Sequence, residues 1–274
     1  KEAWIAESGE DTTGAICWEL GQRYVQSWVG KSQISDRNES HASGFRRNGV
    51  YWVTGGVGRL SIQVARYLAE SYDATVIVSG RREKPSDWTA LSAACPQLHY
   101  LRADVEHLEV LQAVRDEIVP RFGDLSGVIH VAGIVEDKHL LRQNRSDIDR
   151  VLGPKVLGVH NLDQVTASDS LDCFVVFSSM AAITGNEGQT VYAAGNGYLD
   201  GFVSERNRRS DRQGRAVSIN WPLWEDGGMT LAEAIRERLR REAGLEPMPS
   251  AVALQALDLV VSENLERCVP WYGR

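Results

Sequence analysis

A glycine-rich segment lies between the first strongly apolar run of this chain and a helix-length stretch. Its residues are Thr54, Gly55, Gly56, Val57, Gly58, Arg59, Leu60 and Ser61. Glycine permits a tight turn and lets backbone amides approach a pyrophosphate, whose charge the N-terminus of the following helix stabilises. The strand before the motif and the helix after it favour a dinucleotide-binding loop over a merely structural turn. Ser61 stands where a third glycine is usual, and we expect this small side chain to be tolerated.

Two arginines follow the second apolar run, in the sequence Ser79-Gly80-Arg81-Arg82. A carboxylate at this point would hold the adenosine ribose of NAD. Arginine instead forms charge-assisted hydrogen bonds with a 2′-phosphate, so the pair predicts NADPH over NADH. The alternative is two solvated arginines without a ligand. The next two apolar runs end in residues that we expect to border the adenine and the ribose, namely Asp104, Val105, Ala132 and Gly133.

Candidates for acid–base chemistry gather farther along the chain. Ser179 ends a strongly apolar run, at the edge of the predicted sheet where ligands of such folds bind. Tyr192 and Asn196 are four residues apart and therefore share one face of the next helix. Lys155 lies in the preceding helical segment and is placed to reach the same cleft. Each residue alone is readily explained by packing or capping, so the combination carries the hypothesis.

The elements that must position these residues follow a regular succession. Apolar runs without clean alternation, which indicate strands buried on both faces, occupy residues 50–54, 74–79, 98–103, 127–132, 172–178, 216–220 and 267–272. Helix-length segments lie between them, for example residues 60–72, 108–122 and 188–209. Strand and helix in alternation predict a parallel sheet with right-handed crossovers and helices on both sides. The expected fold class is therefore α/β, a Rossmann-like doubly wound sheet.

Two further segments add to this fold. Residues 1–47 are polar and irregular, with candidate short strands at 15–18 and 23–28 and then a connector rich in Ser, Asn and Arg. Thr230 and Glu233 form a capping box, followed by apolar positions at Leu231, Ile235 and Leu239 and a stop at Gly244. This pattern predicts an inserted amphipathic helix, which serves either as a lid over the cleft or as ordinary surface packing.

Composition restricts the class of protein. The 274 residues are 43% hydrophobic and 24% charged, with a formal net charge of −7, which is typical of a folded soluble protein. The acidic balance disfavours nonspecific nucleic-acid binding. No stretch reaches the ~18 apolar residues of a membrane span, and an acidic start argues against a signal peptide, so we expect a cytoplasmic protein without a membrane partner. The four cysteines lack metal-site spacing, and we expect no bound metal. Because the first residue is Lys, the chain is expected to be cut from a longer one.

The combined motifs resemble the ketoreductase domains of modular polyketide synthases, within the short-chain dehydrogenase/reductase superfamily. The matching segments are VTGGVGRL, SGRR, ADVEHLEVL, VIHVAG, PKVLGVHNL, FVVFSSMAA, GQTVYAAGNGYLDGF and SINWPLWEDGGM. Most reductases of the superfamily have lysine four residues after the tyrosine. This chain has Asn196 there and its lysine upstream, the exchange typical of synthase ketoreductases.

The resemblance implies a role for each member of the cluster. Tyr192 is expected to be the general acid that protonates a carbonyl oxygen while hydride arrives from NADPH. Lys155 is expected to stabilise the phenolate by its charge and to bind the nicotinamide ribose. Ser179 would donate a hydrogen bond to the substrate oxygen, and Asn196 would hold the lysine and a relay water. The implied reaction is reduction of a β-ketoacyl thioester on an acyl carrier protein, among neighbouring synthase domains.

The resemblance also identifies the segments that handle the substrate. In similar ketoreductases the loop after the sixth strand borders the nicotinamide, here with Pro222 and Leu223, and the substrate entrance. Trp224 and Met229 are placed to line a groove for the acyl chain and its phosphopantetheine arm, or else belong to ordinary lid packing.

A stereochemical fingerprint favours a B-type, D-hydroxyl product. Relatives that make the D-hydroxyl carry Leu-Asp-Asp after the fourth strand, where this chain has Val135-Glu136-Asp137. Relatives that make the L-hydroxyl carry Trp eight residues before the tyrosine, where this chain has Thr184. The final aspartate is kept and the Trp is absent.

The expected domains are residues 1–47, a remnant of the structural subdomain and its linker, and residues 48–274, the catalytic domain. Two other functions stay open. A catalytically silent ketoreductase kept as a scaffold predicts little cofactor binding, and a free-standing reductase of small ketones predicts no dependence on a carrier protein.

Overall fold

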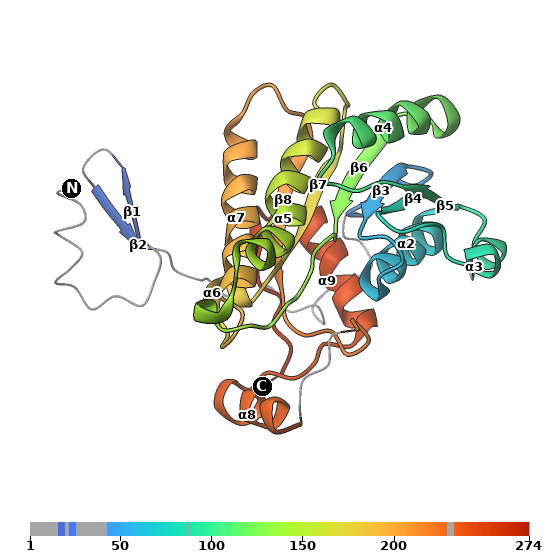
Figure 1. The fold of residues 1–274 in the computed structure, drawn as a ribbon. Coiled ribbons are helices and arrows are strands. Elements are labelled where there is room, and N and C mark those ends of the chain that lie inside the picture. The colour runs from blue at the N-terminus through green and yellow to red at the C-terminus, as the bar shows by residue number, and fades with distance from the viewer. Residues whose placement is uncertain (1–15, 20–21, 26–42, 87, 229–232, 274) are drawn as a thin grey trace. The chain divides into compact units, whose positions relative to one another are not determined.

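The computed structural model describes residues 16–19, 22–25, 43–86, 88–228 and 233–273 (Figure 1). The chain forms two compact units, residues 1–41 and residues 42–274. In the first unit, strand β1 (Ile16–Glu19) pairs antiparallel with β2 (Gln22–Val25). The predicted strands at 15–18 and 23–28 are therefore each found within a residue of their expected start. Residues 15 and 26–28 lie outside the described residues.

The second unit is built on a parallel sheet of seven strands in the order β5-β4-β3-β6-β7-β8-β9. The strands are β3 (Val50–Thr54), β4 (Thr75–Gly80), β5 (Leu98–Arg102), β6 (Leu125–His130), β7 (Cys173–Ser179), β8 (Arg215–Trp221) and β9 (Arg267–Cys268). Every neighbouring pair is parallel. This arrangement confirms the predicted doubly wound α/β fold.

Helices cover both faces of the sheet (Figure 1). On one face, α4 (Leu108–Phe122) packs on α5 (Arg145–Val165), which packs on α7 (Thr190–Arg208). On the other face, α2 (Arg59–Tyr72) contacts α9 (Ser250–Ser262). The remaining elements are α3 (Trp88–Ala94), the short 3-10 helix η2 (Leu140–Arg142), α6 (Ala181–Thr184) and α8 (Glu233–Ala243). No helix in the described ranges is long and apolar enough to cross a membrane.

The apolar runs become strands because both of their faces are buried. One core cluster joins Trp52, Ile77 and Phe174 of the sheet with Leu162 of α5 and Leu199 of α7, and all five side chains are fully buried. Burial of a large apolar side chain contributes roughly 1.5–3 kcal/mol, so these contacts fix the helices on the sheet. The fold thereby holds the carboxyl ends of the strands in a fixed arrangement.

Three predicted boundaries differ from the structure for identifiable reasons. The run at 127–132 forms β6 at 125–130, because the Ala132 amide donates to Thr54 Oγ1 rather than to a neighbouring strand. The run at 267–272 gives only a strand of two residues, since Pro270 lacks the N–H that the ladder needs. Helix α7 begins at Thr190 rather than at Gly188, whose φ of +76° is not helical.

Strand order places the candidate site. Neighbours β3 and β6 lie at the point where the chain reverses its direction of winding, and ligands of such sheets bind in the crevice there. The predicted inserted helix is present as α8, which begins at Glu233, whereas Thr230 and Leu231 of the capping box lie outside the described residues.

Candidate active site

A large cleft lies along the carboxyl ends of the sheet strands. Its volume is about 1760 Å³, more than the ~300–1,000 Å³ of a site for one drug-sized ligand. The predicted site residues that line it are Gly55, Gly56, Val57, Gly58, Arg59, Leu60, Ser79, Gly80, Arg81, Arg82, Asp104, Val105, Ala132, Gly133, Asp137, Lys155, Ser179, Tyr192, Pro222, Leu223 and Trp224. One cleft therefore brings the glycine loop and the acid–base candidates together.

The glycine loop has the geometry of a phosphate cradle. Gly55 and Gly56 have φ values of +111° and +62°, which side chains other than glycine rarely adopt. The Gly56 amide donates to the Ser79 carbonyl at 2.7 Å and ties the loop to β4. A Cβ atom on Gly80 would lie 2.5 Å from Gly56 Cα, so both positions require glycine. The N-terminus of α2 follows directly, and these residues fit a dinucleotide pyrophosphate.

Ser61 reinforces this loop where a third glycine is usual. Its side chain is buried, and Oγ lies 2.7 Å from the Gly56 carbonyl oxygen and 2.9 Å from that of Gly58. The hydroxyl thus donates to the inner side of the turn. The departure from the glycine pattern adds a hydrogen bond to the turn.

Thr54 lies beneath the cleft and does not form its wall. Thr54 Oγ1 is 2.8 Å from His130 Nδ1, and His130 Nε2 is 3.0 Å from the Pro154 carbonyl. A carbonyl only accepts, so Nε2 carries the proton and Nδ1 accepts from the Thr54 hydroxyl. Burial lowers the pKa of His130 to about 3, which keeps the ring neutral. Thr54 therefore links β3 to β6 through His130. His130 in turn contacts Pro154, the residue before Lys155.

Tyr100 holds the backbone of the turn after β4, and the arginine side chains of this turn are exposed. The Tyr100 hydroxyl donates to the carbonyl oxygens of Gly80 at 3.2 Å and Arg82 at 2.7 Å, while the side chains of Arg81 and Arg82 are exposed. Ser79 Oγ accepts from the Trp52 indole at 2.8 Å and is fully buried. This turn combines a fixed main chain with positive charge at the cleft rim.

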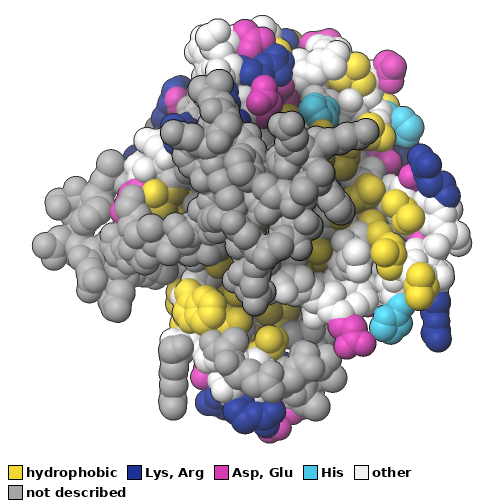
Figure 2. All heavy atoms as spheres, turned by 90° about the vertical axis from the view of Figure 1, so that its left-hand side faces the viewer, with side chains coloured by type: hydrophobic (Ala, Val, Ile, Leu, Met, Phe, Trp, Pro, Cys, Tyr) yellow, Lys and Arg dark blue, Asp and Glu magenta, His cyan; other side chains and the backbone are white. Residues whose placement is uncertain are grey.

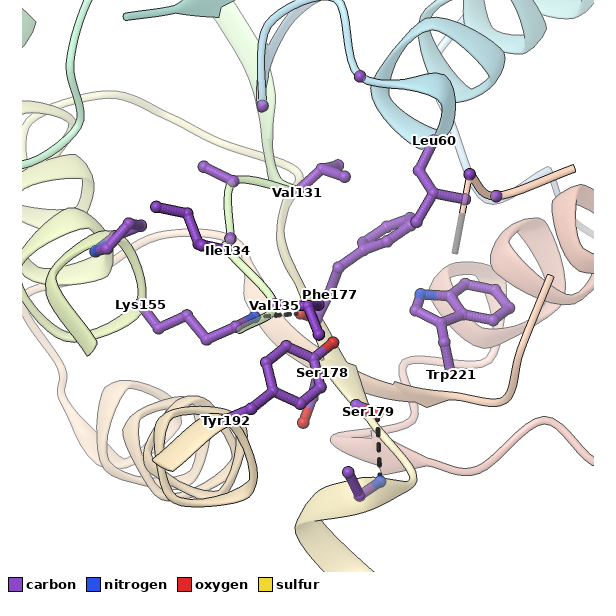
Figure 3. A pocket seen from close by; sticks show the side chains of 18 of the residues that line it. Leu60, Val131, Ile134, Val135, Lys155, Phe177, Ser178, Ser179, Tyr192 and Trp221 are labelled. Carbon is purple, nitrogen blue, oxygen red and sulfur yellow. Dashed lines mark hydrogen bonds between the residues drawn. The ribbon is translucent and has the colours of Figure 1, made fainter. Parts of the chain in front are cut away.

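Lys155 is buried beside Tyr192. Its side chain extends from α5 toward the end of β7, and Tyr192 extends there from α7 (Figure 3). The ammonium donates to the Phe177 carbonyl at 3.2 Å and lies 5.6 Å from the centre of the Tyr192 ring. Burial lowers the pKa of Lys155 to about 8, and the negative charge of Asp200 opposes this shift. The lysine therefore stays charged at neutral pH.

Tyr192 and Ser179 face each other across the floor of the cleft (Figure 3). Burial raises the pKa of the Tyr192 phenol, while hydrogen bonds with Ser179 and Asn196 lower it and Asp137 raises it. The Ser179 hydroxyl oxygen also accepts from the Ala181 amide at 3.2 Å, which fixes its direction. A phenol with a raised pKa remains protonated at neutral pH and so can donate a proton.

Asn196 lies one turn behind Tyr192 and is fully buried rather than exposed to the cleft. Its amide nitrogen donates to the Tyr192 carbonyl at 2.8 Å. Its side-chain oxygen is buried and has no hydrogen-bond partner among the described residues. A buried oxygen without a donor favours a ligand or water at that point.

The loop of the stereochemical fingerprint is tied to the start of α7. Asp137 Oδ1 accepts from the side-chain amide of Gln189 at 2.8 Å. The backbone amide of Lys138 donates to the Gly188 carbonyl at 2.8 Å. Glu136 does not line the cleft and instead pairs with Arg150 of α5 at 2.9 Å. Of the two acidic fingerprint positions, only Asp137 reaches the cleft beside Tyr192.

The loop after β8 covers the phosphate loop. Trp224 is buried and forms a β-bridge with Met248, and a Cβ on Gly227 would lie 3.2 Å from Leu60. Pro222 and Leu223 line the cleft within this loop. Met229 lies outside the described residues.

Several residues of this cleft were not predicted from the sequence. Gln189 orients Asp137, and Phe177 supplies the carbonyl that holds Lys155. Glu106 also lines the cleft, and burial raises its pKa. The position of Gln189, three residues before Tyr192 on the cleft side, was the signal that could have identified it.

Comparison with known proteins agrees with this geometry. The family model described as the KR domain matches residues 49–226. The chain is similar to polyketide synthase PksN of Bacillus subtilis, with 35% identity over 271 residues, which cover 92% of this chain and 5% of PksN. Polyketide synthase ThaG of Burkholderia thailandensis is 36% identical over 233 residues, which cover 83% of this chain and 4% of ThaG.

Solved structures show the same likeness. A ketoreductase domain from the bacillaene assembly line superposes with a TM-score of 0.85 at 30% identity, covering 94% of this chain and 63% of that chain. The first ketoreductase of the tylosin synthase gives a TM-score of 0.81 at 26% identity, covering 99% and 58%. This chain therefore spans a small part of the synthases it matches and under two thirds of these ketoreductase structures.

Fold and cleft define a nucleotide-binding oxidoreductase of the short-chain dehydrogenase/reductase type. Within that class, the chain belongs to the KR domain family, the ketoreductase domains of polyketide synthases. Members of this family act on a keto group with a nicotinamide cofactor.

Proposed function

We propose that this chain reduces a β-ketoacyl thioester, carried by an acyl carrier protein, to the β-hydroxyacyl thioester with NADPH. The convergence of Tyr192, Ser179 and Lys155 on one point of the cleft that also contains the glycine loop supports this proposal most strongly. A structural scaffold would not need a buried charged lysine at that point, because burying a charge destabilises the fold.

Different residues of the cleft would hold different parts of the cofactor. The turn of Gly55, Gly56 and Gly58 would hold the pyrophosphate, and Arg81 and Arg82 the 2′-phosphate. Asp104 and Val105 would border the adenine, Ala132 and Gly133 the ribose, and Pro222 and Leu223 the nicotinamide. NADPH, when bound, supplies a hydride to the carbonyl carbon.

The chain's own groups manage the carbonyl oxygen. The Ser179 hydroxyl donates a hydrogen bond to that oxygen and orients it beside Tyr192. The Tyr192 phenol then gives its proton to the oxygen, which becomes the product hydroxyl. Donors aimed at a developing negative charge contribute about 2.7–4 kcal/mol each in comparable sites.

Lys155 and Asn196 serve the proton donor. The Lys155 ammonium stabilises the phenolate that remains on Tyr192 and binds the nicotinamide ribose. Asn196, whose side-chain oxygen lacks a protein partner within the described part of the chain, orients a water that returns a proton. This relay restores the phenol for the next turnover.

The fingerprint residues favour a B-type, D-hydroxyl product. Asp137 is held by Gln189 at the cleft wall beside Tyr192, whereas Glu136 faces Arg150. Asp137 would direct the acyl chain toward one side of the tyrosine, and Trp224 would line its groove.

Partners follow from the family. Substrate delivery on a carrier protein and contact with neighbouring synthase domains fit a chain that spans 5% of PksN. Large apolar side chains remain exposed on α5 and α7, with Leu157 at 52% and Tyr198 at 40%. Figure 2 shows apolar side chains on the side where these helices lie in Figure 1. Such surface favours contacts with other domains.

Substitution of the proton donor tests the proposal. The wild-type chain and Tyr192→Phe are incubated with NADPH and a β-ketoacyl thioester on a carrier protein, and NADPH oxidation is followed. We expect turnover by the wild type and a loss of at least about 100-fold in the variant, with NADPH affinity retained. Equal loss of NADPH binding and turnover would contradict the acid role, and an inactive wild type would favour a silent scaffold.

A further inference from the structure

A buried carboxylate lies on the same helix as the proton donor. Asp200 follows Tyr192 and Asn196 at intervals of four residues, so all three share one face of α7. Its side chain is 3% exposed. The carboxylate accepts from the Ser218 hydroxyl at 2.6 Å and from the Asn220 amide at 2.8 Å, and both donors belong to β8. Arg267 of β9 adds an ion pair at 3.2 Å.

Asn220 connects this carboxylate to the end of β7. Its amide nitrogen lies 2.9 Å from Ser178 Oγ and 3.2 Å from the Ser179 carbonyl oxygen, in addition to its bond with Asp200. The Ser178 hydroxyl in turn lies 3.2 Å from the Asn196 carbonyl oxygen. The chain of bonds runs from α7 through β8 to β7 and back to α7. It therefore fixes the distance between the Ser179 backbone and the helix that carries Tyr192.

The same carboxylate acts on Lys155 through its charge. In the described ranges the Lys155 ammonium donates to the Phe177 carbonyl and forms no ion pair within 4 Å. The titratable groups that face it are His130 from β6, which is neutral, and Tyr192 and Asp200 from α7. Asp200 is thus the negative charge that favours the protonated lysine against burial.

We propose that Asp200 is a positioning residue of the reductase centre, which aligns Ser179 with Tyr192 through Asn220 and supplies the negative charge that faces Lys155 from α7. This inference rests on the proposed function. Neither Asp200 nor Asn220 lines the cleft, so both act through other residues.

The chain offers a matched control in Asp163. This aspartate is also buried, at 3% exposure, and it pairs with Arg206 of α7 at 2.9 Å. Arg212 and Arg209 add further contacts with the same carboxylate. Asp163 does not line the cleft, and its charge is not among those that shift the pKa of Lys155. Loss of its charge therefore reports the general effect of breaking a buried ion pair in this fold.

The experiment compares Asp200→Asn with Asp163→Asn in the whole chain. Thermal unfolding, the Kd for NADP⁺, kcat and the pH profile of kcat are measured for both. For Asp200→Asn we expect kcat to fall about 10-fold or more, because small misplacements have large effects on rate. We expect the alkaline limb of its profile to move down by about half a pH unit or more. Asp163→Asn should lower thermal stability and leave the alkaline limb in place.

Two more variants separate geometry from charge. Ser178→Ala removes the hydroxyl that joins Asn220 to Asn196 but keeps every charge, so kcat should fall without a shift of the alkaline limb. Arg267 pairs with Asp200 and also donates to Asn220 Oδ1 at 3.4 Å. Arg267→Gln removes the cation but keeps an amide donor for Asn220, so the alkaline limb should move to higher pH. These variants decide the question even when Asp200→Asn does not fold.

The outcomes distinguish this inference from the proposed function. An inactive wild type contradicts the proposed function, and the inference is then tested by the titration of Lys155, followed by NMR, in the wild type and Arg267→Gln. An active wild type with unchanged kcat and unchanged alkaline limbs in Asp200→Asn, Ser178→Ala and Arg267→Gln overturns the inference. Identical behaviour of Asp200→Asn and Asp163→Asn overturns it as well.

Discussion

Lys155 combines a position in the core with a positive charge, and the two requirements oppose each other. The residue is 3% exposed, and burial lowers its pKa from 10.5 to about 8. In the unfolded chain the lysine keeps its proton up to higher pH. Burial of the charge therefore destabilises the fold below about pH 8, and this destabilisation is lost as the pH rises toward 10.5.

A neutral side chain at this position should stabilise the protein while it removes activity. For Lys155→Met we expect the free energy of unfolding at pH 7 to rise by about 1–3 kcal/mol. We expect the gain to shrink as the pH approaches 10.5. Denaturant titrations of the cofactor-free chain at pH 7 and near pH 10.5 measure this difference. A gain of the same size at both values would show that the lysine charge is not its source.

The same pKa sets the pH range of the reaction. The raised pKa of Tyr192 keeps the phenol protonated, and Lys155 keeps its charge below about pH 8. We expect kcat for reduction to fall as the pH rises through the pKa of Lys155. A profile of kcat that is flat across that range would contradict the role of the lysine charge.

In the proposed function, Arg81 selects NADPH over NADH. Its exposed guanidinium lies on the cleft wall at the end of β4, where a 2′-phosphate would bind. Arg81→Ala should weaken NADPH binding by about 10-fold or more and leave NADH binding nearly unchanged, since a charge-assisted bond contributes roughly 1.5–3 kcal/mol. Arg66→Ala removes an exposed guanidinium of α2 that pairs with Glu70 and does not line the cleft, and serves as the control. An unchanged preference for NADPH in Arg81→Ala would refute this role.

At the scale of elements, the phosphate loop depends on Ser61. The hydroxyl donates into the turn formed by Gly56 and Gly58, and the turn packs against Gly80. Ser61→Ala should lower the free energy of unfolding by about 1 kcal/mol through the lost hydrogen bond. Ser61→Gly should lower it by a further ~0.5–1 kcal/mol, because glycine is disfavoured within a helix.

Denaturant unfolding and NADP⁺ titration measure these effects. Ser92→Ala, which removes an exposed hydroxyl of α3 whose bond to Thr89 is 3.3 Å long, is the control and should change stability by less than ~0.5 kcal/mol. A more stable Ser61→Gly variant would mean that the serine is only tolerated in place of glycine.

The elements themselves were accessible from the sequence because each strand is a contiguous apolar run. Helix α4 (Leu108–Phe122) was predicted at its observed bounds, and β3 (Val50–Thr54) as well. The end of β6 was not, because the Thr54 hydroxyl takes the Ala132 amide out of the ladder. That contact joins residues 78 positions apart, which no local pattern reports.

Some features of the candidate site could likewise be predicted from the sequence, and others depend on the tertiary structure. The spacing of Tyr192 and Asn196, and the position of Ser179 at a strand end, follow from local periodicity. The links among Asp200, Asn220 and Ser178 join α7, β8 and β7, so they depend on the tertiary structure. The buried position of Thr54 likewise depends on the contact with His130.

At the scale of the whole molecule, the compact second unit includes residues ahead of the proposed domain boundary at residue 48. Phe45 is buried and packs edge-on against Tyr51 and Tyr72, and the Gly44 amide donates to Asp258 at 2.9 Å. We propose that residues 1–47 derive from the structural subdomain and linker, since this chain covers 63% of the bacillaene ketoreductase structure. Residues 43–47 are then the part of that linker that packs on the catalytic unit.

The central claim is that the groups gathered in the cleft deliver a proton to a carbonyl oxygen and hold the carbonyl so that bound NADPH would give its hydride to one face of the carbonyl carbon. Incubation with a racemic 2-methyl-3-ketoacyl thioester and NADPH, followed by chiral analysis of the product, tests it most directly. We expect a 3-hydroxyacyl thioester of D configuration, formed faster from the carrier-protein thioester than from a free one. Absence of any hydroxyacyl product from a folded chain that binds NADPH would contradict it.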